Sequence, residues 1–456
     1  MLSLMKKGLP LLAAALLLSA CGGNAAPPSA TSAPASDTAT ASAPTTEPAA
    51  AGPVTINVWG WNPDATSVKP YQEAFEKANP NIKVNYRFMQ YADYTSALPL
   101  GLQSNSGPDA FGLQVGGLTT QTAPFAEDLA PVFASALGSD WNTKMIAADQ
   151  FVVDGKQVAM PWMVTGGGLV WANQTMIDSL KLKMPTNMSE LVTFCKAVKA
   201  AGKDCWLAGA KDAWTNLDVY QSIMNQISPG LFYKAEAGQA DWSSPEFVKG
   251  FDVWKSLFDK GIFQKGAIGV SLYPDVADAF HKGKAALMAN GTWENGGTTN
   301  AGVKAFAESL GKDVDVNTIF MPYFFPQLVD GGTTGTMFGG PDVGWAVSSA
   351  SPNKEAAATF VKWMTSSQEA QTLMGKSGQQ PALASVPIDM SDVKTDAQKA
   401  AIQSQSAALA KMVGARQMTN PDVQTALSDA LSAVASGQQS SADAAKAVET
   451  AQKAIG

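Results

Sequence analysis

A tryptophan with polar neighbours is the residue best suited to bind a ligand. Trp293 precedes Glu294 directly and lies close to Asn290 and Asn295 in the sequence. An indole ring offers an apolar face, while carboxylate and amide groups form hydrogen bonds. This combination suits a sugar, whose ring has apolar C–H faces and polar hydroxyl groups. The alternative is a tryptophan that packs in the core beneath a loop.

The elements around this tryptophan would place it at the edge of a sheet. The residues before Gly283 predict the end of an amphipathic helix, and this glycine permits the turn that follows. Residues 285–288 predict a short buried strand, which Asn290 and Gly291 interrupt. Trp293 is therefore expected at the carboxyl end of a strand, where ligands bind in open α/β sheets.

The composition indicates a folded protein with two domains or lobes. The chain has 456 residues, of which 46% are hydrophobic and 16% charged, enough for two cores. Its net charge is −7, and it falls to −9 without Lys6 and Lys7, which lie in a segment expected to be removed. Because the basic residues form no cluster, nucleic acid and anionic membrane surfaces are not expected partners.

The N-terminal residues indicate export. An apolar run at residues 9–18 follows two lysines and is too short to span a bilayer. Residues 18–21, Leu-Ser-Ala-Cys, resemble the bacterial lipoprotein signal, in which the cysteine is lipid-modified after cleavage. We expect a lipoprotein signal peptide at residues 1–20 and a lipid anchor on Cys21. The alternative is a generic signal peptide with an incidental cysteine.

Residues 21–52 consist almost entirely of Ala, Ser, Thr and Pro, which predicts a disordered tether between the anchor and the folded part.

The other two cysteines are Cys195, on a predicted helix that begins at Asn187, and Cys205, at the start of a predicted strand. A strand that runs back along a helix can bring them together, and an exported protein permits a disulfide. With one His in the chain, no metal site or other cofactor is expected.

Strands and helices alternate from residue 54 onward, which predicts a mostly parallel sheet and an α/β fold. We expect a strand followed by a Gly/Asn/Pro turn within residues 54–64, strands at 82–88 and 108–115, and helices at 68–78 and 92–103. Asp154 and Gly155 predict a hairpin turn. The glycines at 166–168 lack the spacing of a phosphate loop. Helices are also expected at 245–258, with a core of aromatic residues, from residue 353 onward, and in the tail at 396–454.

Several landmarks, in order, resemble the solute-binding proteins of ABC sugar importers, of the maltose-binding type. They are the lipoprotein start, Pro108-Asp109, Ala159-Met160-Pro161, the helix start at Asn187 and Glu190, residues 282–293, and residues 339–357. The resemblance spans about residues 53–450. It implies a two-lobe periplasmic-binding-protein fold with three hinge crossings, expected near Pro161, at 320–322 and at 338–347. The expected N-terminal lobe is 53–161 plus 322–345, and the C-terminal lobe is 162–321 plus 346–456.

The same resemblance implies which residues bind the ligand. The candidates follow predicted strands or lie at the crossings: Trp59, Trp61, Asn62, Gln90, Tyr91, Gln114, Trp162, Thr165, Trp214, Trp293, Glu294, Gly340 and Asp342. The chain departs from the family where aromatic residues are common, at Leu113-Gln114 and around residues 421–424. These absences argue against maltose in particular.

The function that the resemblance implies is capture of a carbohydrate by lobe closure and its delivery to the membrane permease of an ABC importer. The expected protein is a monomer without enzyme activity, outside the cytoplasm, and attached to the membrane only through its lipid. A polyamine or a glycerol phosphate is the alternative ligand. A carbohydrate-active enzyme is less favoured, since no motif links Glu294 to Asp342. His281, at a helix end flanked by lysine, is expected on the surface.

Replacement of Trp293 separates ligand binding from packing. We expect Trp293→Ala to weaken sugar binding severely, because the stacking surface is lost, and to leave the melting temperature of the ligand-free protein almost unchanged. Titration calorimetry and thermal melting measure the two effects. A large drop in the stability of the ligand-free variant would favour the core tryptophan instead.

Overall fold

The computed structural model describes residues 52–104 and 106–455. The predicted signal peptide, Cys21 and nearly all of the predicted tether lie outside these residues. Within the described part of the chain, no helix combines the length and the apolar character needed to cross a membrane.

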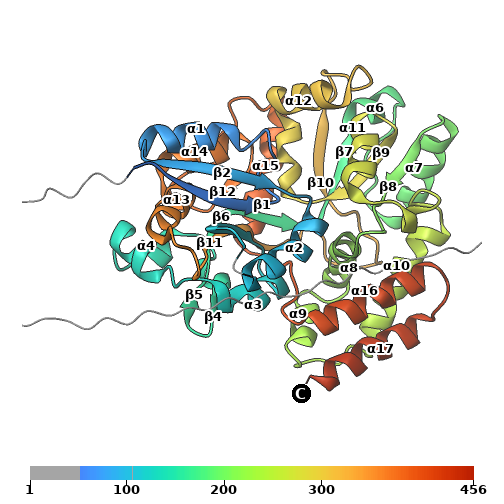
Figure 1. Ribbon diagram of the computed structural model, residues 1–456. Coiled ribbons are helices and arrows are strands. Elements are labelled where there is room, and N and C mark those ends of the chain that lie inside the picture. Colours follow the sequence, from blue (N-terminus) through green and yellow to red (C-terminus); the bar gives the residue numbers. More distant parts are fainter. Residues whose placement is uncertain (1–51, 105, 456) are drawn as a thin grey trace, which may run out of the picture. The chain divides into compact units, whose positions relative to one another are not determined.

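The first sheet has six strands (Figure 1). In spatial order they are β12 (Gln380–Pro381), β6 (Met160–Gly167), β11 (Phe338–Val347), β3 (Ala110–Leu113), β1 (Val54–Gly60) and β2 (Ile82–Phe88). The strands β2, β1 and β3 are parallel, and β11 runs antiparallel to both β3 and β6. Ile56 and Val58 point into a core that also holds residues of α1 (Lys69–Ala78), α13 (Lys354–Ser366) and α14 (Gln368–Lys376).

The second sheet has four strands, in the order β10 (Phe320–Phe324), β7 (Leu169–Asn173), β9 (Ala285–Asn290) and β8 (Asp204–Leu207). Only β8 and β9 are parallel among its pairs. Its largest core contains residues of α7 (Met188–Ala200), α8 (Ala213–Ile227), α10 (Pro245–Asp259), α16 (Pro421–Ala435) and α17 (Ser441–Ala454). The predicted C-terminal helices are thus present and pack beside this sheet.

The other α-helices of the described residues are α2 (Tyr91–Gln103), α3 (Gly117–Thr122), α4 (Ala130–Leu137), α5 (Trp141–Lys144), α6 (Gln174–Ser179), α9 (Leu231–Glu236), α11 (Ala277–His281), α12 (Asn300–Leu310) and α15 (Asp396–Leu409). The predicted hairpin is formed by β4 (Val152–Val153) and β5 (Lys156–Gln157). Its turn residues, Asp154 and Gly155, both have positive φ, as this type of turn requires.

The chain passes between the two lobes three times: between β6 and β7, between β10 and β11, and after β12, where α15 follows and bonds to β10 through Gln398. The third crossing differs from the one expected at 338–347, because β11 stays in the six-stranded sheet between β3 and β6. The lobe boundaries differ accordingly. Helices α13 and α14, expected in the C-terminal lobe, pack in the core of the six-stranded sheet through Phe360, Met364 and Met374.

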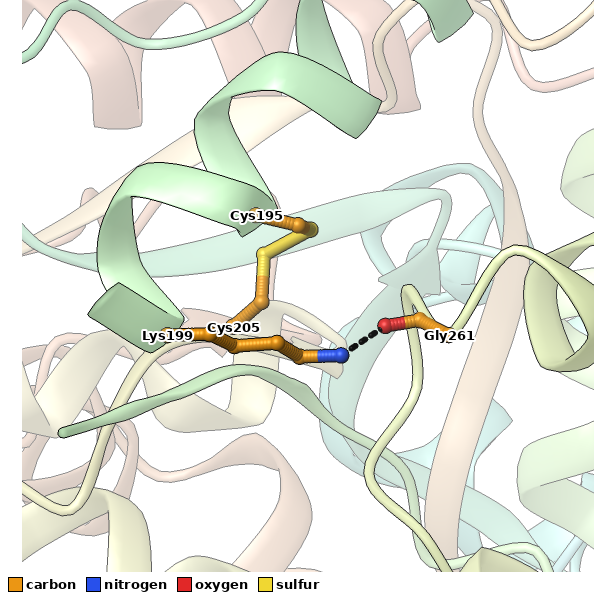
Figure 2. Close-up of a disulfide and its surroundings, with 4 residues drawn as sticks. All are labelled: Cys195, Lys199, Cys205 and Gly261. Atoms are coloured by element: carbon orange, nitrogen blue, oxygen red, sulfur yellow. Dashed lines mark hydrogen bonds between the residues drawn. A yellow bond between two sulfur atoms is a disulfide. The ribbon is translucent and has the colours of Figure 1, made fainter.

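A disulfide joins Cys195 on α7 to Cys205 on β8, as the sequence predicted (Figure 2). Asn187 caps the helix by accepting a hydrogen bond from the backbone N–H of Glu190. At the other end of the helix, the Lys199 ammonium donates to the carbonyl oxygen of Gly261. The disulfide closes a short loop, so a stabilisation of roughly 2–3 kcal/mol is expected from the entropy of the unfolded chain.

Candidate functional site

A buried arginine lies where the two sheets meet. Arg416 belongs to the segment between α15 and α16, and its side chain is 8% exposed. Its Nε lies 3.0 Å from both carboxylate oxygens of Asp218 on α8. Its Nη1 donates to Oδ1 of Asp342 on β11 at 3.1 Å. One guanidinium thus joins a helix beside the four-stranded sheet to a strand of the six-stranded sheet.

The backbone around Arg416 is also bound on both sides. The N–H of Gly339, on β11, donates to the carbonyl oxygen of Gly414 at 3.0 Å. The side-chain amide of Gln221, on α8, donates to the carbonyl oxygen of Arg416 at 2.9 Å. The position of the guanidinium is therefore fixed by its backbone as well as by its two ion pairs.

A chain of hydrogen bonds continues from Arg416 along the six-stranded sheet. The amide of Gln114 donates to Oδ1 of Asp342 at 2.6 Å, and the hydroxyl of Tyr91 donates to Oε1 of Gln114 at 2.5 Å. Burial raises the pKa of Tyr91, so this hydroxyl remains a donor at neutral pH. Gln114 and Tyr91 follow β3 and β2, as expected for residues at the carboxyl ends of neighbouring parallel strands.

Three aromatic residues form the other side of the site. Trp214, at the start of α8, lies with its ring centroid 6.3 Å from that of Tyr273 and 6.0 Å from that of Trp293. The indole N–H of Trp293 donates to the Tyr273 hydroxyl at 3.1 Å. The Arg416 guanidinium carbon lies 4.2 Å from the Trp293 ring centroid and 5.1 Å from that of Trp214. The arginine is thus in contact with both indole rings.

Behind Trp293, a second chain of polar groups holds this aromatic cluster. Glu294 is 7% exposed, and its Oε1 lies 2.7 Å from Nε2 of His281. Its Oε2 accepts from the amide of Asn290 at 3.0 Å, and the same amide donates to the Tyr273 hydroxyl. Both oxygens of Glu294 are therefore engaged within the protein, and this residue supports Tyr273 and Trp293 from behind.

The prediction that His281 lies on the surface is wrong. Its side chain is 6% exposed, and its ring stacks on Phe306 of α12 with a centroid distance of 3.8 Å. Helix α12 covers the end of α11, and the lysines beside His281 gave no signal of that tertiary contact. The aromatic residues of α10 are core residues as predicted, with Phe251 and Trp254 almost fully buried.

Other candidate residues lie outside this cluster or at its margin. Trp162 is 2% exposed and packs in the core against Tyr71 and Trp345. The Trp59 ring packs under the guanidinium of Arg87, 4.8 Å away, and Gln90 is exposed.

Trp61 packs against Tyr91 and Tyr94, and Asn62 lies near the sulfur of Met163. Within the described residues, the structure thus brings together Tyr91, Gln114, Thr165, Trp214, Trp293, Gly340 and Asp342.

Two small cavities flank the arginine. One is lined by Thr165, Gly340, Asp342 and Arg416, and the other by Trp214, Asp218 and Asn290, among other residues. Each has a volume of about 10 Å³, which holds roughly one water molecule. A ligand of several hundred Å³ does not fit in this arrangement, so it can enter only if the two lobes or the arginine move.

Arg416, Asp218 and Tyr273 were not predicted as site residues from the sequence. A compositional signal existed for the first, because Arg416 is one of only two arginines in the chain. Asp218 lies on α8 among buried polar residues, which include Asn216, Gln221 and Asn225. A helix that buries so many polar side chains needs hydrogen-bond partners for them. The sequence can indicate this need only once it is known that other elements pack over the helix.

A family model for bacterial extracellular solute-binding proteins matches residues 59–371, more than half of the chain. The chain belongs to this family. The multiple sugar-binding protein of Streptococcus mutans is 24% identical to this solute-binding protein over 337 residues, which are 72% of this chain and 74% of that protein.

Solved structures of similar fold include a protein from work on xylan utilisation by Caldanaerobius polysaccharolyticus, with a TM-score of 0.72 and 22% identity. Another is the maltose-bound MalE3 of T. maritima, with a TM-score of 0.70 and 19% identity. Each comparison covers 88% of this chain and the whole of the other. The predicted α/β fold with two lobes, of the periplasmic-binding-protein type, is confirmed.

The charges around Arg416 alter the titration of this solute-binding protein. Burial raises the pKa of Asp218 to about 6; the guanidinium of Arg416 opposes this rise, and the nearby carboxylate of Asp342 adds to it. Burial lowers the pKa of Arg416, but the two carboxylates outweigh it, and the net shift is upward. The arginine therefore stays charged at neutral pH and below.

Asp218 should make stability depend on pH. Below about pH 6 the folded protein binds a proton at Asp218, while the unfolded chain does so only near pH 4. A proton that binds Asp218 in the folded state and not in the unfolded state stabilises the folded state. The contribution of Asp218 to the free energy of unfolding therefore rises as the pH falls, by up to about 2–3 kcal/mol. As the pH is lowered from 7 to 4, we expect the melting temperature of the wild type to rise relative to that of Asp218→Asn.

The matched control is Asp259→Asn, which removes a carboxylate that pairs with Lys255 on the surface of α10. Its melting temperature should follow that of the wild type over the same pH range. A difference between wild type and Asp218→Asn that does not change with pH would contradict the assignment to Asp218.

Proposed function

We propose that the chain is a lipid-anchored binding protein outside the cytoplasm, which captures a mono- to oligosaccharide by lobe closure. It would deliver this ligand to the membrane permease of an ABC importer and would have no enzyme activity of its own. The multiple sugar-binding protein of Streptococcus mutans and the maltose-bound structure from T. maritima support a sugar as the ligand class.

The observation that carries this proposal is the composition of the interlobe cluster. Trp214, Tyr273 and Trp293 offer aromatic faces, and Gln114 and Asp342 offer hydrogen-bonding groups from the other sheet. Aromatic faces pack on the C–H faces of a sugar ring, while amide and carboxylate groups bind its hydroxyls. A ligand that contacts groups from both lobes would stabilise the closed arrangement by its higher affinity for it.

The charges of the site argue against the alternative ligands. A polyamine needs carboxylates that lack a partner, but Arg416 already neutralises much of the charge of Asp218 and Asp342. A glycerol phosphate needs free cations, and Arg416, whose Nε and Nη1 are engaged by carboxylates, is the only cation among the described residues that line the two cavities. An uncharged sugar is the ligand class that fits this balance.

A thermal-shift screen tests the ligand class. The purified protein is heated with neutral mono-, di- and oligosaccharides, polyols, spermidine or glycerol phosphate. We expect one class of neutral sugar to raise the melting temperature, by an amount that grows with concentration, because only binding to the folded state has this effect. A rise with spermidine or glycerol phosphate alone would overturn the proposal for sugar, and consumption of the sugar would indicate an enzyme.

The lipid anchor is tested at Cys21. We expect the wild type to sediment with the membrane fraction of the producing bacterium and Cys21→Ser to remain in the aqueous fraction, because the variant lacks the thiol that carries the lipid. Immunoblots of the two fractions measure the partition, and Ser19→Ala is the matched control, expected to stay with the membrane. Equal partition of wild type and Cys21→Ser would contradict lipidation at this residue.

A further inference from the structure

The surroundings of Arg416 have the composition of a binding site for an organic cation. Two indole rings, of Trp214 and Trp293, lie 5.1 and 4.2 Å from the guanidinium carbon. Asp218 and Asp342 accept hydrogen bonds from two of its nitrogens. We refer to these four residues as the cation box. Aromatic faces together with carboxylates attract guanidinium and ammonium groups, and the attraction grows when water is excluded.

We propose that Arg416 is a specificity-determining residue that fills the cation box and thereby restricts the ligand to uncharged molecules. The guanidinium takes the place that a cationic ligand would occupy, in contact with the same rings and the same carboxylates. An amino sugar, a polyamine or a guanidino compound would have to displace a group of the same sign of charge that is held by its own backbone. The part of this inference that concerns the ligand rests on the proposed function, while the occupation of the box by Arg416 does not.

The charge balance explains why one residue would control this choice. Asp218 and Asp342 have side chains that are 15% and 10% exposed, so water screens them poorly. With Arg416 present, a neutral ligand finds a site whose carboxylates already have a partner. Without it, the two carboxylates lie beside two indole rings with no cation among the described residues that line the cavities, and the box becomes selective for cations.

Removal of the arginine side chain should therefore create a site for small cations. We expect methylguanidinium, a fragment of the arginine side chain, to raise the melting temperature of Arg416→Ala at millimolar concentration, relative to sodium chloride of the same ionic strength. The wild type should show no such rise, and its affinity should be at least roughly tenfold weaker. Titration calorimetry measures the difference in affinity.

Two variants control for the charge and for the fold. Arg416→Lys keeps a cation in the box, so it should resemble the wild type in its lack of response to methylguanidinium. Lys411→Ala removes an exposed cation of the same segment that takes no part in the ion pairs of Asp218 and Asp342, and it should also resemble the wild type. A merely structural role of Arg416 would destabilise Arg416→Ala without making it respond to methylguanidinium.

If Arg416→Ala does not fold, the double variant Asp218→Asn/Arg416→Ala takes its place, because it leaves one carboxylate without a partner and not two. We expect it to fold and to respond to methylguanidinium through Asp342. A folded variant that does not respond, or a wild type that responds as strongly as the variant, would overturn the proposal. A response of Arg416→Ala combined with a wild type that binds no sugar would uphold the filled box and overturn the proposed function.

Discussion

A charge without water must have its counter-charges within reach, and Arg416 imposes this requirement on two lobes at once. Its carboxylate partners come from α8 and from β11, which belong to different sheets. A buried guanidinium that loses both of them is left uncompensated, which is strongly destabilising. The observed arrangement of the lobes is thus the one in which this charge is satisfied, and any opening must offer water or a ligand group in exchange.

Small residues make the close approach at the crossings possible. Gly166 and Gly167 end β6, and Gly339 and Gly340 lie beside them on β11. A Cβ atom at Gly339 would clash with the carbonyl oxygen of Thr165, and one at Gly340 would clash with the side chain of Gln150. The run of glycines thus serves strand packing next to Asp342 and Arg416, and the backbone near the site is dictated by this contact.

The polar groups behind Trp293 show how the candidate binding surface is held in place. His281, Glu294, Asn290 and Tyr273 form a continuous chain of contacts that ends at the indole N–H. Each of the two carboxylate oxygens of Glu294 has a partner, and these contacts offset the free-energy cost of burying the carboxylate. Glu294, which the sequence predicted to contact the ligand, has both carboxylate oxygens bound within the protein and lies behind Tyr273 and Trp293.

The sequence by itself determined the elements and their class. Apolar periodicity, capping residues and turn residues act over a few positions, so the alternating strands and helices, the hairpin at Asp154-Gly155 and the disulfide between Cys195 and Cys205 could be predicted. Only the tertiary structure decided which side chains meet. Trp162 and Trp293 were both predicted to bind the ligand, yet Trp162 is in the core and Trp293 is half-buried at the interlobe cluster. Arg416 lies 74 residues from Asp342 and 198 from Asp218. Ion pairs between residues so far apart in the sequence depend on how the sheets pack, and a local sequence pattern does not predict that packing.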